Sequence, residues 1–369
     1  MIRRHSKDVL VDSVGRRPVR ISVRLAAVAV VVVLIELIVG YALFWKQSHG
    51  LGSLHELAII ARERWFVQPA VSRPVSTPIT TYHSAPLPFY KPDANFGFAA
   101  NEGRQTVTIA KDGLSHRFIT TVLPLGNGRA TSSSSSSDHP ARVIGIFGDS
   151  WVFGWGNADE TTFPFILQSR FPTDLVRNFA FNGWSNIHAL IKLKSLMSQG
   201  DELNVVVMAY ADFYDERNVA APSRLKGYKK NLMTKDYMPD MPGYGHPRAR
   251  LMQGRLVVDM IPLFCEDNGL CDQPDPSERA QHKVTLSVLA EARSVFPHAR
   301  YLLAYLRGPD ESPVVASATA LGYETVDLRQ KTPLEWDDFI PLDDHPGPKA
   351  HVAFADKLFQ VLAMAPNSK

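Results

Sequence analysis

Short apolar runs alternate with amphipathic stretches along the larger, C-terminal part of the chain. The runs at 141–149 and 175–181 predict strands, and the run at 203–210 is almost unbroken, which predicts a strand buried on both faces of a parallel sheet. The stretches between them, at 163–171 and 185–199, have apolar residues at helical spacing, which predicts helices. The first half of this part is therefore expected to consist of strand and helix pairs.

The same order resumes after a break in the pattern. Helices are predicted at 277–297, 312–322 and 348–365, and strands at 299–307 and 323–329. The alternation is typical of a three-layer α/β domain with a central parallel sheet, here over 141–366. The break, at about 221–276, predicts an irregular insert with one strand-like run at 255–264, and long insertions of this kind tend to overhang active sites.

The residues before this domain, 46–140, are less regular. At 76–125, prolines, turn pairs and alternating β-formers predict a small β-rich segment of short strands. The sequence GNGRATSSSSSSDHP at 126–140 predicts a flexible surface loop, because six consecutive serines cannot bury apolar surface. Residues 46–75 are expected to form a helix and a linker.

A long apolar segment at 25–45 contains 21 residues and one charge. That is the length that a helix needs to cross about 30 Å of hydrocarbon. Residues 1–24 carry seven Lys and Arg, so the positive-inside rule predicts a short cytoplasmic tail and the export of 46–369. We predict a single-pass anchor in the inner membrane with the main domain in the periplasm or outside the cell. A cleaved signal peptide is the alternative, and it also exports the rest.

Composition and charge narrow the class of protein. Apolar residues make up 45% of the chain and charged residues 21%, which is typical of a folded protein and excludes a disordered one. Residues 1–24 hold seven basic and two acidic side chains, a net +5, so the total of +3 leaves the remainder near −2. The basic character is local, and nothing in the charge favours nucleic acid as a partner.

The two cysteines, Cys265 and Cys271, enclose a short loop with a turn signal. They are too few for a scaffold built on disulfides, but export makes one bridge between them chemically possible. We expect that bridge. Two buried free thiols are the alternative, and a metal site is the least favoured because no paired histidine lies nearby.

Candidate chemistry gathers just after the predicted strands, where open parallel sheets bind their ligands. Ser150 follows the first strand on a tight turn that would expose its hydroxyl. Asn182 and Gly183 follow the second, where a missing Cβ lets a backbone N–H point into the same crevice. Asp343 and His345 precede the last helix as a base with a carboxylate that can fix its tautomer. Together they form a nucleophile, a base, an orienting group and two backbone donors.

Each element has an ordinary structural explanation when it is taken alone. Ser150 could cap a helix, and His345 before a proline could be a solvated loop residue. Their joint order along the strands favours catalysis, because a random loop would seldom reproduce it. His188 and His351 lie within predicted helices and are expected to be packing or surface residues.

Three motifs in the chain resemble those of the SGNH (GDSL-type) hydrolase superfamily. GDSWVFGWG looks like the nucleophile motif, NFAFNGWS like the second motif with its oxyanion glycine, and DDHPGPKAHVAFADKL like the Asp-His motif. The resemblance covers about 141–366. It implies a three-layer, flavodoxin-like fold, with Ser150, Asp343 and His345 as catalytic residues. It also implies an oxyanion hole made by the backbone N–H groups of Ser150 and Gly183.

The family's third motif is altered in this chain. Where the family has Gly-x-Asn-Asp, residues 209–212 read Ala-Tyr-Ala-Asp, so Ala211 replaces the asparagine that would donate to the oxyanion. Asn218 is one candidate replacement donor and Arg217 is another, because both lie in the stretch that follows.

The position of the carboxylate is altered as well. The common pattern has the carboxylate three residues before the histidine, where this chain has Leu342. Asp343 fits a known variant with two residues' spacing, and Asp344 is a weaker candidate.

The sequence therefore predicts an exported, membrane-anchored serine esterase or O-acyltransferase that acts on O-acyl esters, with no cofactor and no metal. An insert rich in tyrosine and lysine and an envelope location suit an acylated envelope or exported polysaccharide as substrate. The alternative is a catalytically silent SGNH-like domain that binds glycan or a partner in an envelope assembly. Hydrolase and transferase both stay open, because they differ in whether water or a hydroxyl acceptor reaches the acyl-serine.

Overall fold

The computed structural model describes residues 81–124, 128–132, 140–232, 243–263, 269–329 and 338–364. The chain divides into two compact units, Met1–Ser76 and Thr77–Lys369, and every described residue belongs to the second. The predicted cytoplasmic tail, membrane span and linker helix lie outside the described residues. Within the described ranges, no helix is long and apolar enough to cross a membrane.

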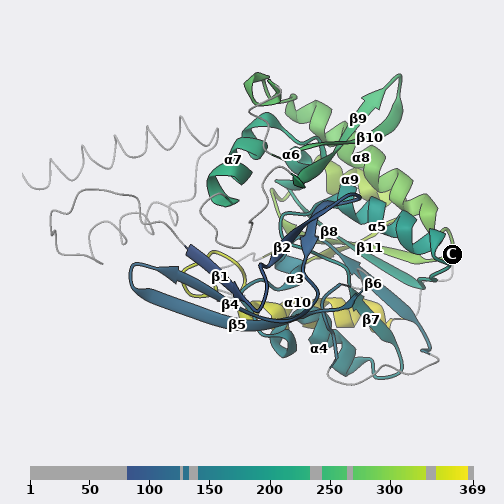
Figure 1. Cartoon of the computed structure of the whole chain (residues 1–369). Helices are drawn as coiled ribbons and strands as arrows, with labels where there is room; N and C mark the ends of the chain where they lie inside the picture. Colours follow the sequence, from purple (N-terminus) through teal and green to yellow (C-terminus); the bar gives the residue numbers. More distant parts are fainter. Residues whose placement is uncertain are drawn as a thin grey trace, which may run out of the picture. The chain divides into compact units, whose positions relative to one another are not determined.

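A parallel sheet of five strands, in the order β12-β11-β8-β6-β7, occupies the centre of the fold (Figure 1). The strands are β6 (Val143–Phe147), β7 (Leu175–Asn178), β8 (Val205–Ala211), β11 (Arg300–Arg307) and β12 (Glu324–Asp327). All residues of the central β8 are buried, as its apolar sequence predicts. The predicted α/β fold with a central parallel sheet is confirmed.

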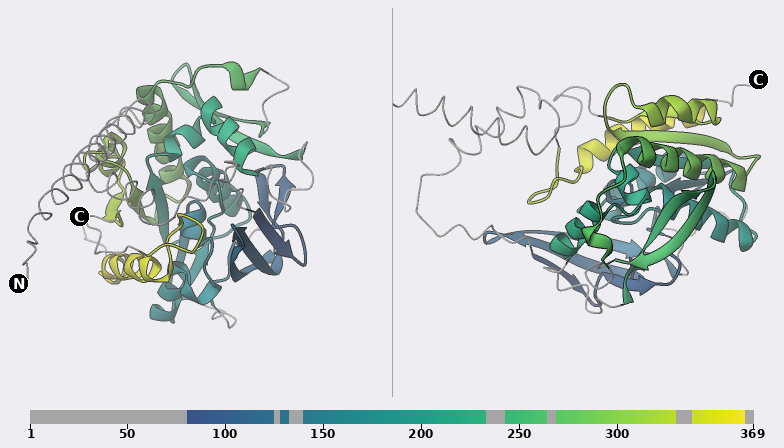
Figure 2. Two further views of the ribbon diagram at one scale, coloured as in Figure 1. Left: turned by 90° about the vertical axis from the view of Figure 1, so that its left-hand side faces the viewer. Right: turned by 90° about the horizontal axis from the view of Figure 1, so that it is seen from above.

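Helices cover both faces of this sheet (Figure 2). On one face α4 (Phe163–Arg170) packs against α10 (Pro348–Ala363). On the other, α8 (Glu278–Val295) contacts both α5 (Asn186–Ser198) and α9 (Pro313–Ala320). Because the strands are parallel, the loops that follow them meet at one edge of the sheet.

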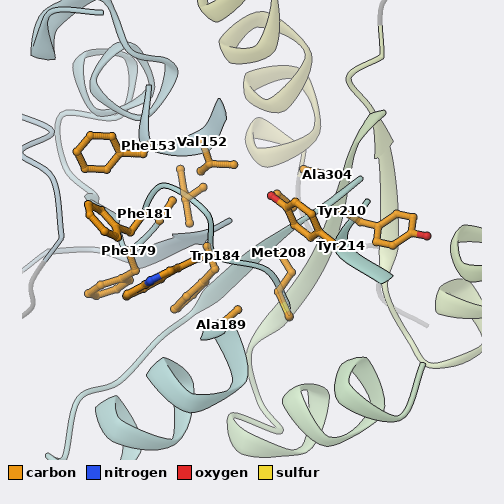
Figure 3. Close-up of a cluster of buried hydrophobic side chains, with 14 of the residues drawn as sticks. Val152, Phe153, Phe179, Phe181, Trp184, Ala189, Met208, Tyr210, Tyr214 and Ala304 are labelled. Atoms are coloured by element: carbon orange, nitrogen blue, oxygen red, sulfur yellow. The ribbon is translucent and has the colours of Figure 1, made fainter. Parts of the chain in front are cut away.

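Aromatic side chains fill the core beside that edge (Figure 3). Phe181 makes edge-to-face contacts with Phe153 and Trp184, at ring-centroid distances of 5.6 and 5.7 Å. Phe179 stacks on Phe147 at 5.2 Å. Burial of each ring is worth about 1.5–3 kcal/mol, so the cluster fixes the two loops that carry Ser150 and Gly183.

The β-rich segment expected upstream contains five strands in its described residues, 81–124. They are β1 (Thr81–Ala85), β2 (Tyr90–Asp93), β3 (Gly97–Ala100), β4 (Gly103–Lys111) and β5 (Leu114–Val122). β1, β4 and β5 form an antiparallel sheet, and β2 pairs with β3. The buried rings of Phe89 and Phe98 contact Phe181, so this segment packs directly on the aromatic core.

The insert between the halves of the α/β part is more regular than its sequence predicts. Helix α7 (Pro222–Leu232) is followed by the antiparallel pair of β9 (Gly245–Met252) and β10 (Arg255–Pro262). The strand-like run at 255–264 becomes β10, whereas β9 was not anticipated. Cys271 is disulfide-bonded, and its predicted partner Cys265 lies outside the described residues.

Arg129 corrects the prediction of a flexible surface loop for residues 128–132, whereas 133–139, with most of the serine run, lie outside the described residues. The Arg129 side chain is fully buried, and its backbone bridges the end of β5 to β7 at the edge of the central sheet. The guanidinium pairs with Asp159 at 2.7 Å and donates to the carbonyl oxygens of Phe153, Gly154 and Asn157. Burial lowers the pKa of Arg129, and Asp159 counteracts this. Part of the apparent loop is therefore a structural brace beneath α3 (Ser150–Phe153).

Arg129→Met should reduce the free energy of unfolding by about 3–5 kcal/mol. The change removes the hydrogen bonds that the guanidinium donates to the Asp159 carboxylate and to three carbonyl oxygens. Urea denaturation of the purified protein would measure the loss. Arg104→Met, on an exposed position of β4, is the matched control and should change little. A loss below about 1 kcal/mol for Arg129→Met would contradict the proposed brace.

Candidate active site

Ser150 is the first residue of α3, and only Gly148 and Asp149 separate it from the end of β6. Asp149 caps this short helix, because its Oδ1 accepts from the Trp151 N–H at 3.0 Å. The helix ends at Gly154, whose φ of 85° is the left-handed conformation that glycine allows. Ser150 is thus held on a tight strand-to-helix turn, as its sequence predicts.

The loop before α10 brings a histidine and an aspartate to this serine. His345 Nε2 lies 2.7 Å from Ser150 Oγ, and His345 Nδ1 lies 2.5 Å from Asp343 Oδ1. The alternative carboxylate, Asp344, is 4.0 Å from the same Nδ1, and its side chain is 98% exposed. The arrangement is that of a nucleophile, a base and an orienting carboxylate, and Asp343 is the orienting carboxylate.

Neighbouring groups hold Asp343 in place. Its side chain is 7% exposed, and its Oδ2 accepts from Trp155 Nε1 at 3.3 Å. Burial, followed by the nearby Asp343 charge, raises the pKa of Tyr82 in β1, so the phenol stays protonated beside the carboxylate. Trp155 and Tyr82 were not identified from the sequence, because nothing in the local pattern indicates contacts across such long stretches of chain.

Gly183 lies in the turn after β7, with φ of +78°. A Cβ there would lie 3.2 Å from the Phe98 ring, so both conformation and space favour glycine. Tyr228 donates to the Gly183 carbonyl oxygen at 2.8 Å, which holds the Gly183–Trp184 peptide next to the proposed donor. The backbone N–H groups of Ser150 and Gly183 donate to no group among the described residues.

The altered third motif leaves no side-chain donor where the resemblance would put one. Ala211 is fully buried at the end of β8. Asn218 is also fully buried: its Oδ1 accepts from the Ile187 N–H at 3.0 Å, and its Nδ2 donates to Thr285 at 2.9 Å. Both polar atoms serve the packing of α5, α6 (Tyr214–Asn218) and α8, so this geometry does not favour Asn218 as the replacement donor.

Two other histidines are packing residues, as expected. His188 and His351 are fully buried in α5 and α10. Burial lowers the pKa of both, to about 3 for His351, so both rings are neutral. His351 Nδ1 accepts from the Phe163 N–H, which joins α10 to α4.

Asp343, Asp344 and His345 could together offer ligand atoms to a metal ion, since these atoms lie within 4.8 Å of one another. Both ring nitrogens of His345 are already within hydrogen-bond distance of Asp343 and Ser150. A metal bound there would have to break one of these contacts, so the donor set fits proton transfer better than metal ligation.

The chain matches no family model and no curated protein. Among solved structures, it is similar to a carbohydrate esterase family 2 enzyme of Myceliophthora fergusii, with 14% identity, a TM-score of 0.36 and coverage of 69% of this chain and 70% of that one. For an acetyl xylan esterase of Butyrivibrio proteoclasticus these values are 13%, 0.35, 63% and 66%. For a salicylyl-acyltransferase they are 10%, 0.33, 78% and 75%. These neighbours are esterases and acyltransferases, but likeness at this level carries no argument about this chain, whose chemistry rests on its own residues.

Proposed function

We propose that the protein is a serine esterase or O-acyltransferase of the SGNH type that acts on O-acyl esters. The observation that carries the proposal is the continuous hydrogen-bonded line from Ser150 Oγ through His345 to the buried carboxylate of Asp343. In this line His345 Nδ1–H donates a hydrogen bond to the Asp343 carboxylate, which leaves Nε2 unprotonated and able to accept from the serine hydroxyl.

The proposed reaction follows from the direction of these two hydrogen bonds. His345 takes the Ser150 proton while Oγ attacks the ester carbonyl, and the backbone N–H groups of Ser150 and Gly183 stabilise the developing oxyanion. The imidazolium, held by Asp343, then protonates the leaving alcohol. Water or a sugar hydroxyl, deprotonated by His345, then attacks the acyl-serine and releases Ser150. Attack by water gives hydrolysis, and attack by the hydroxyl gives acyl transfer.

The proposed setting is the cell envelope, with the enzyme anchored by the 25–45 segment and its site outside the cytoplasm. The proposed substrate is an acylated envelope or exported polysaccharide. Trp151, which adjoins Ser150, and Tyr82, beside Asp343, are half-buried aromatic side chains that could contact a sugar ring.

A silent glycan-binding domain is the second candidate, favoured by the buried Ala211 in place of a donor. The loss of one such donor costs about 10²–10³ in turnover, so it slows an enzyme without abolishing it. The intact line of Ser150, His345 and Asp343 has no role in a passive binder, which favours the enzyme.

Fluorophosphonate labelling of the purified protein tests the proposal. We expect one covalent adduct at Ser150, since the probe needs an activated serine and an oxyanion site but no particular acyl group. Ser150→Ala should remove the adduct. If the folded wild-type protein stays unlabelled and binds acylated glycan without turnover, the binding domain is the correct assignment.

A further inference from the structure

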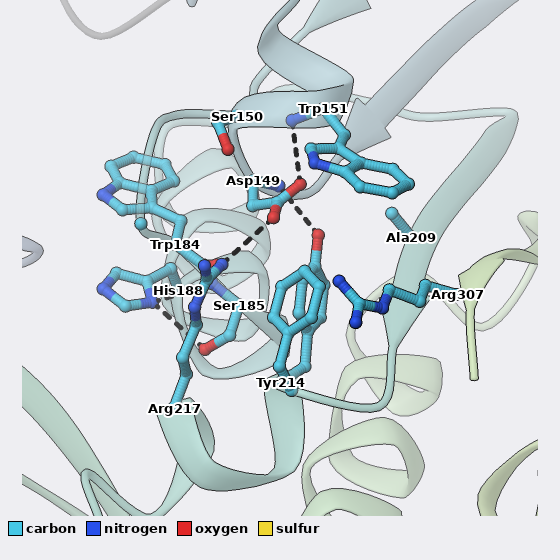
Figure 4. A network of polar contacts seen from close by, with 12 residues as sticks. Asp149, Ser150, Trp151, Trp184, Ser185, His188, Ala209, Tyr214, Arg217 and Arg307 are labelled. Carbon is cyan, nitrogen blue, oxygen red and sulfur yellow. Dashed lines mark hydrogen bonds and ion pairs between the residues drawn. The ribbon is translucent and has the colours of Figure 1, made fainter. Parts of the chain in front are cut away.

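Arg217 joins the two turns that carry the proposed oxyanion donors (Figure 4). From α6, its Nη1 donates to Asp149 Oδ2 and to the Trp184 carbonyl oxygen, each at 3.0 Å. Asp149 is the chain neighbour of Ser150, and Trp184 is the neighbour of Gly183. One guanidinium nitrogen thus bonds to both turns at once.

The nucleophile turn depends strongly on this contact. The Asp149 side chain is 1% exposed, so its charge has little solvent to stabilise it. Its second oxygen holds the Trp151 N–H, and its own N–H donates to the Tyr214 hydroxyl at 2.9 Å. Arg217 and Tyr214 both belong to α6, so one short helix fixes Asp149 from two sides.

Arg217 is itself held firmly. Its guanidinium carbon lies 4.4 Å from the centre of the Phe213 ring, and only 12% of its side chain is exposed. Burial acts to lower the pKa of Arg217, but Tyr228, Asp149 and Tyr214 outweigh it and raise that pKa above its usual value. The side chain is therefore a fixed positive charge beside the oxyanion donors. Tyr228 is also the residue that donates to Gly183.

We propose that Arg217 is a positioning residue that compensates for the missing asparagine, by tying the Asp149-Ser150 turn to the Gly183-Trp184 turn so that their two N–H groups stay directed at one point. The inference rests on the proposed function of the site. Two rigidly placed backbone N–H groups can then stabilise the oxyanion without the help of a third, side-chain donor. Preorganised donors are more effective because they need no rearrangement during the reaction.

A merely structural ion pair would behave differently. Its loss would lower stability, but it would not lower kcat selectively or affect the two turns together. The chain offers a matched control in Arg142, which pairs with the buried carboxylate of Asp174 at 2.6 Å. Arg142 precedes β6, so it lies at the end of the strand opposite Ser150.

The test compares Arg217→Ala, Arg217→Lys and Arg142→Gln in the full chain. For Arg217→Ala we expect kcat toward a short-chain acyl ester, and the rate of fluorophosphonate labelling, to fall about 10²-fold or more, with KM within about threefold of wild type. Millimolar guanidinium should restore part of this rate in Arg217→Ala and none in Ser150→Ala. Arg142→Gln should lose stability and keep its kcat.

Arg217→Lys keeps a positive charge but loses the rigid, planar guanidinium that packs on the Phe213 ring and directs Nη1 at both acceptors. This variant provides the test if Arg217→Ala does not fold. We expect it to have near wild-type stability and a kcat lowered about tenfold. If kcat of either variant stays within about threefold of wild type, or falls only in proportion to stability as in Arg142→Gln, the inference is overturned.

A second measurement does not depend on catalysis. In a Ser150→Ala background, Arg217→Ala should speed amide hydrogen exchange at least about tenfold in both 148–152 and 182–186, and Arg142→Gln should do so in neither. If exchange is faster in only one of the two segments, or in neither, the proposal that Arg217 ties the two turns together is overturned. If wild-type protein does not label at all, the proposed function fails, and this exchange experiment still decides the role of Arg217.

Discussion

Ser150→Ala is expected to lower kcat for a short-chain acyl ester by about 10⁴–10⁶-fold, and His345→Ala by a similar amount. The reason is the 2.7 Å contact between Ser150 Oγ and His345 Nε2: one substitution removes the nucleophile, and the other leaves it without a base. The fold should survive both changes, since His345 lies in a loop before α10 and the serine hydroxyl makes no other hydrogen bond among the described residues. Steady-state kinetics and thermal unfolding of the purified variants would measure the two effects separately.

Matched controls are Ser169→Ala and His298→Ala, both at exposed positions away from this edge of the sheet. They should leave kcat unchanged. If the Ser150 and His345 variants keep the wild-type rate, the activity belongs to another site or to a contaminant, and the catalytic assignment is wrong.

Most of the α/β fold could be predicted because its signals are local. β8 is an apolar run that is buried along its whole length, and α8 has buried Val284, Val288, Leu289 and Ala292 at helical spacing. Strand and helix types follow from such periods, and the alternation of the two predicts the layers. Ser150, Gly183 and His345 were proposed as site residues for a related reason: each lies in or beside a turn that precedes a helix, and turns carry their own sequence signals.

What could not be predicted depends on contacts between distant residues. Arg129 lies beside a serine tract, and its burial comes from Asp159 and three carbonyl groups that only the folded chain assembles. β9 contains proline and arginines and pairs because β10 lies alongside it. The link from Arg217 to Asp149 spans 68 residues. Amino-acid composition and hydrophobic periodicity do not indicate contacts between residues so far apart in the sequence.

Asp343→Asn should lower kcat by about 10²–10⁴-fold and leave the nucleophile and base in place. Asparagine keeps the shape of the side chain but loses its charge, so it no longer stabilises the imidazolium that forms when His345 takes the Ser150 proton. Its amide can also donate to Nδ1, which favours the ring tautomer that has no free Nε2 lone pair for the serine. Steady-state kinetics with the same ester would measure the loss, with residual activity well above that of Ser150→Ala.

Asp344→Asn is the control for this prediction, because it makes the same change one residue away. Its side chain is 98% exposed, so water screens its charge, and its nearest oxygen lies 4.0 Å from Nδ1, against 2.5 Å for Asp343. We expect its kcat to stay within about twofold of wild type. If Asp344→Asn is the more damaging change, the orienting carboxylate is the exposed residue. The loop before α10 would then have to rearrange during turnover, exchanging one aspartate for the other at His345.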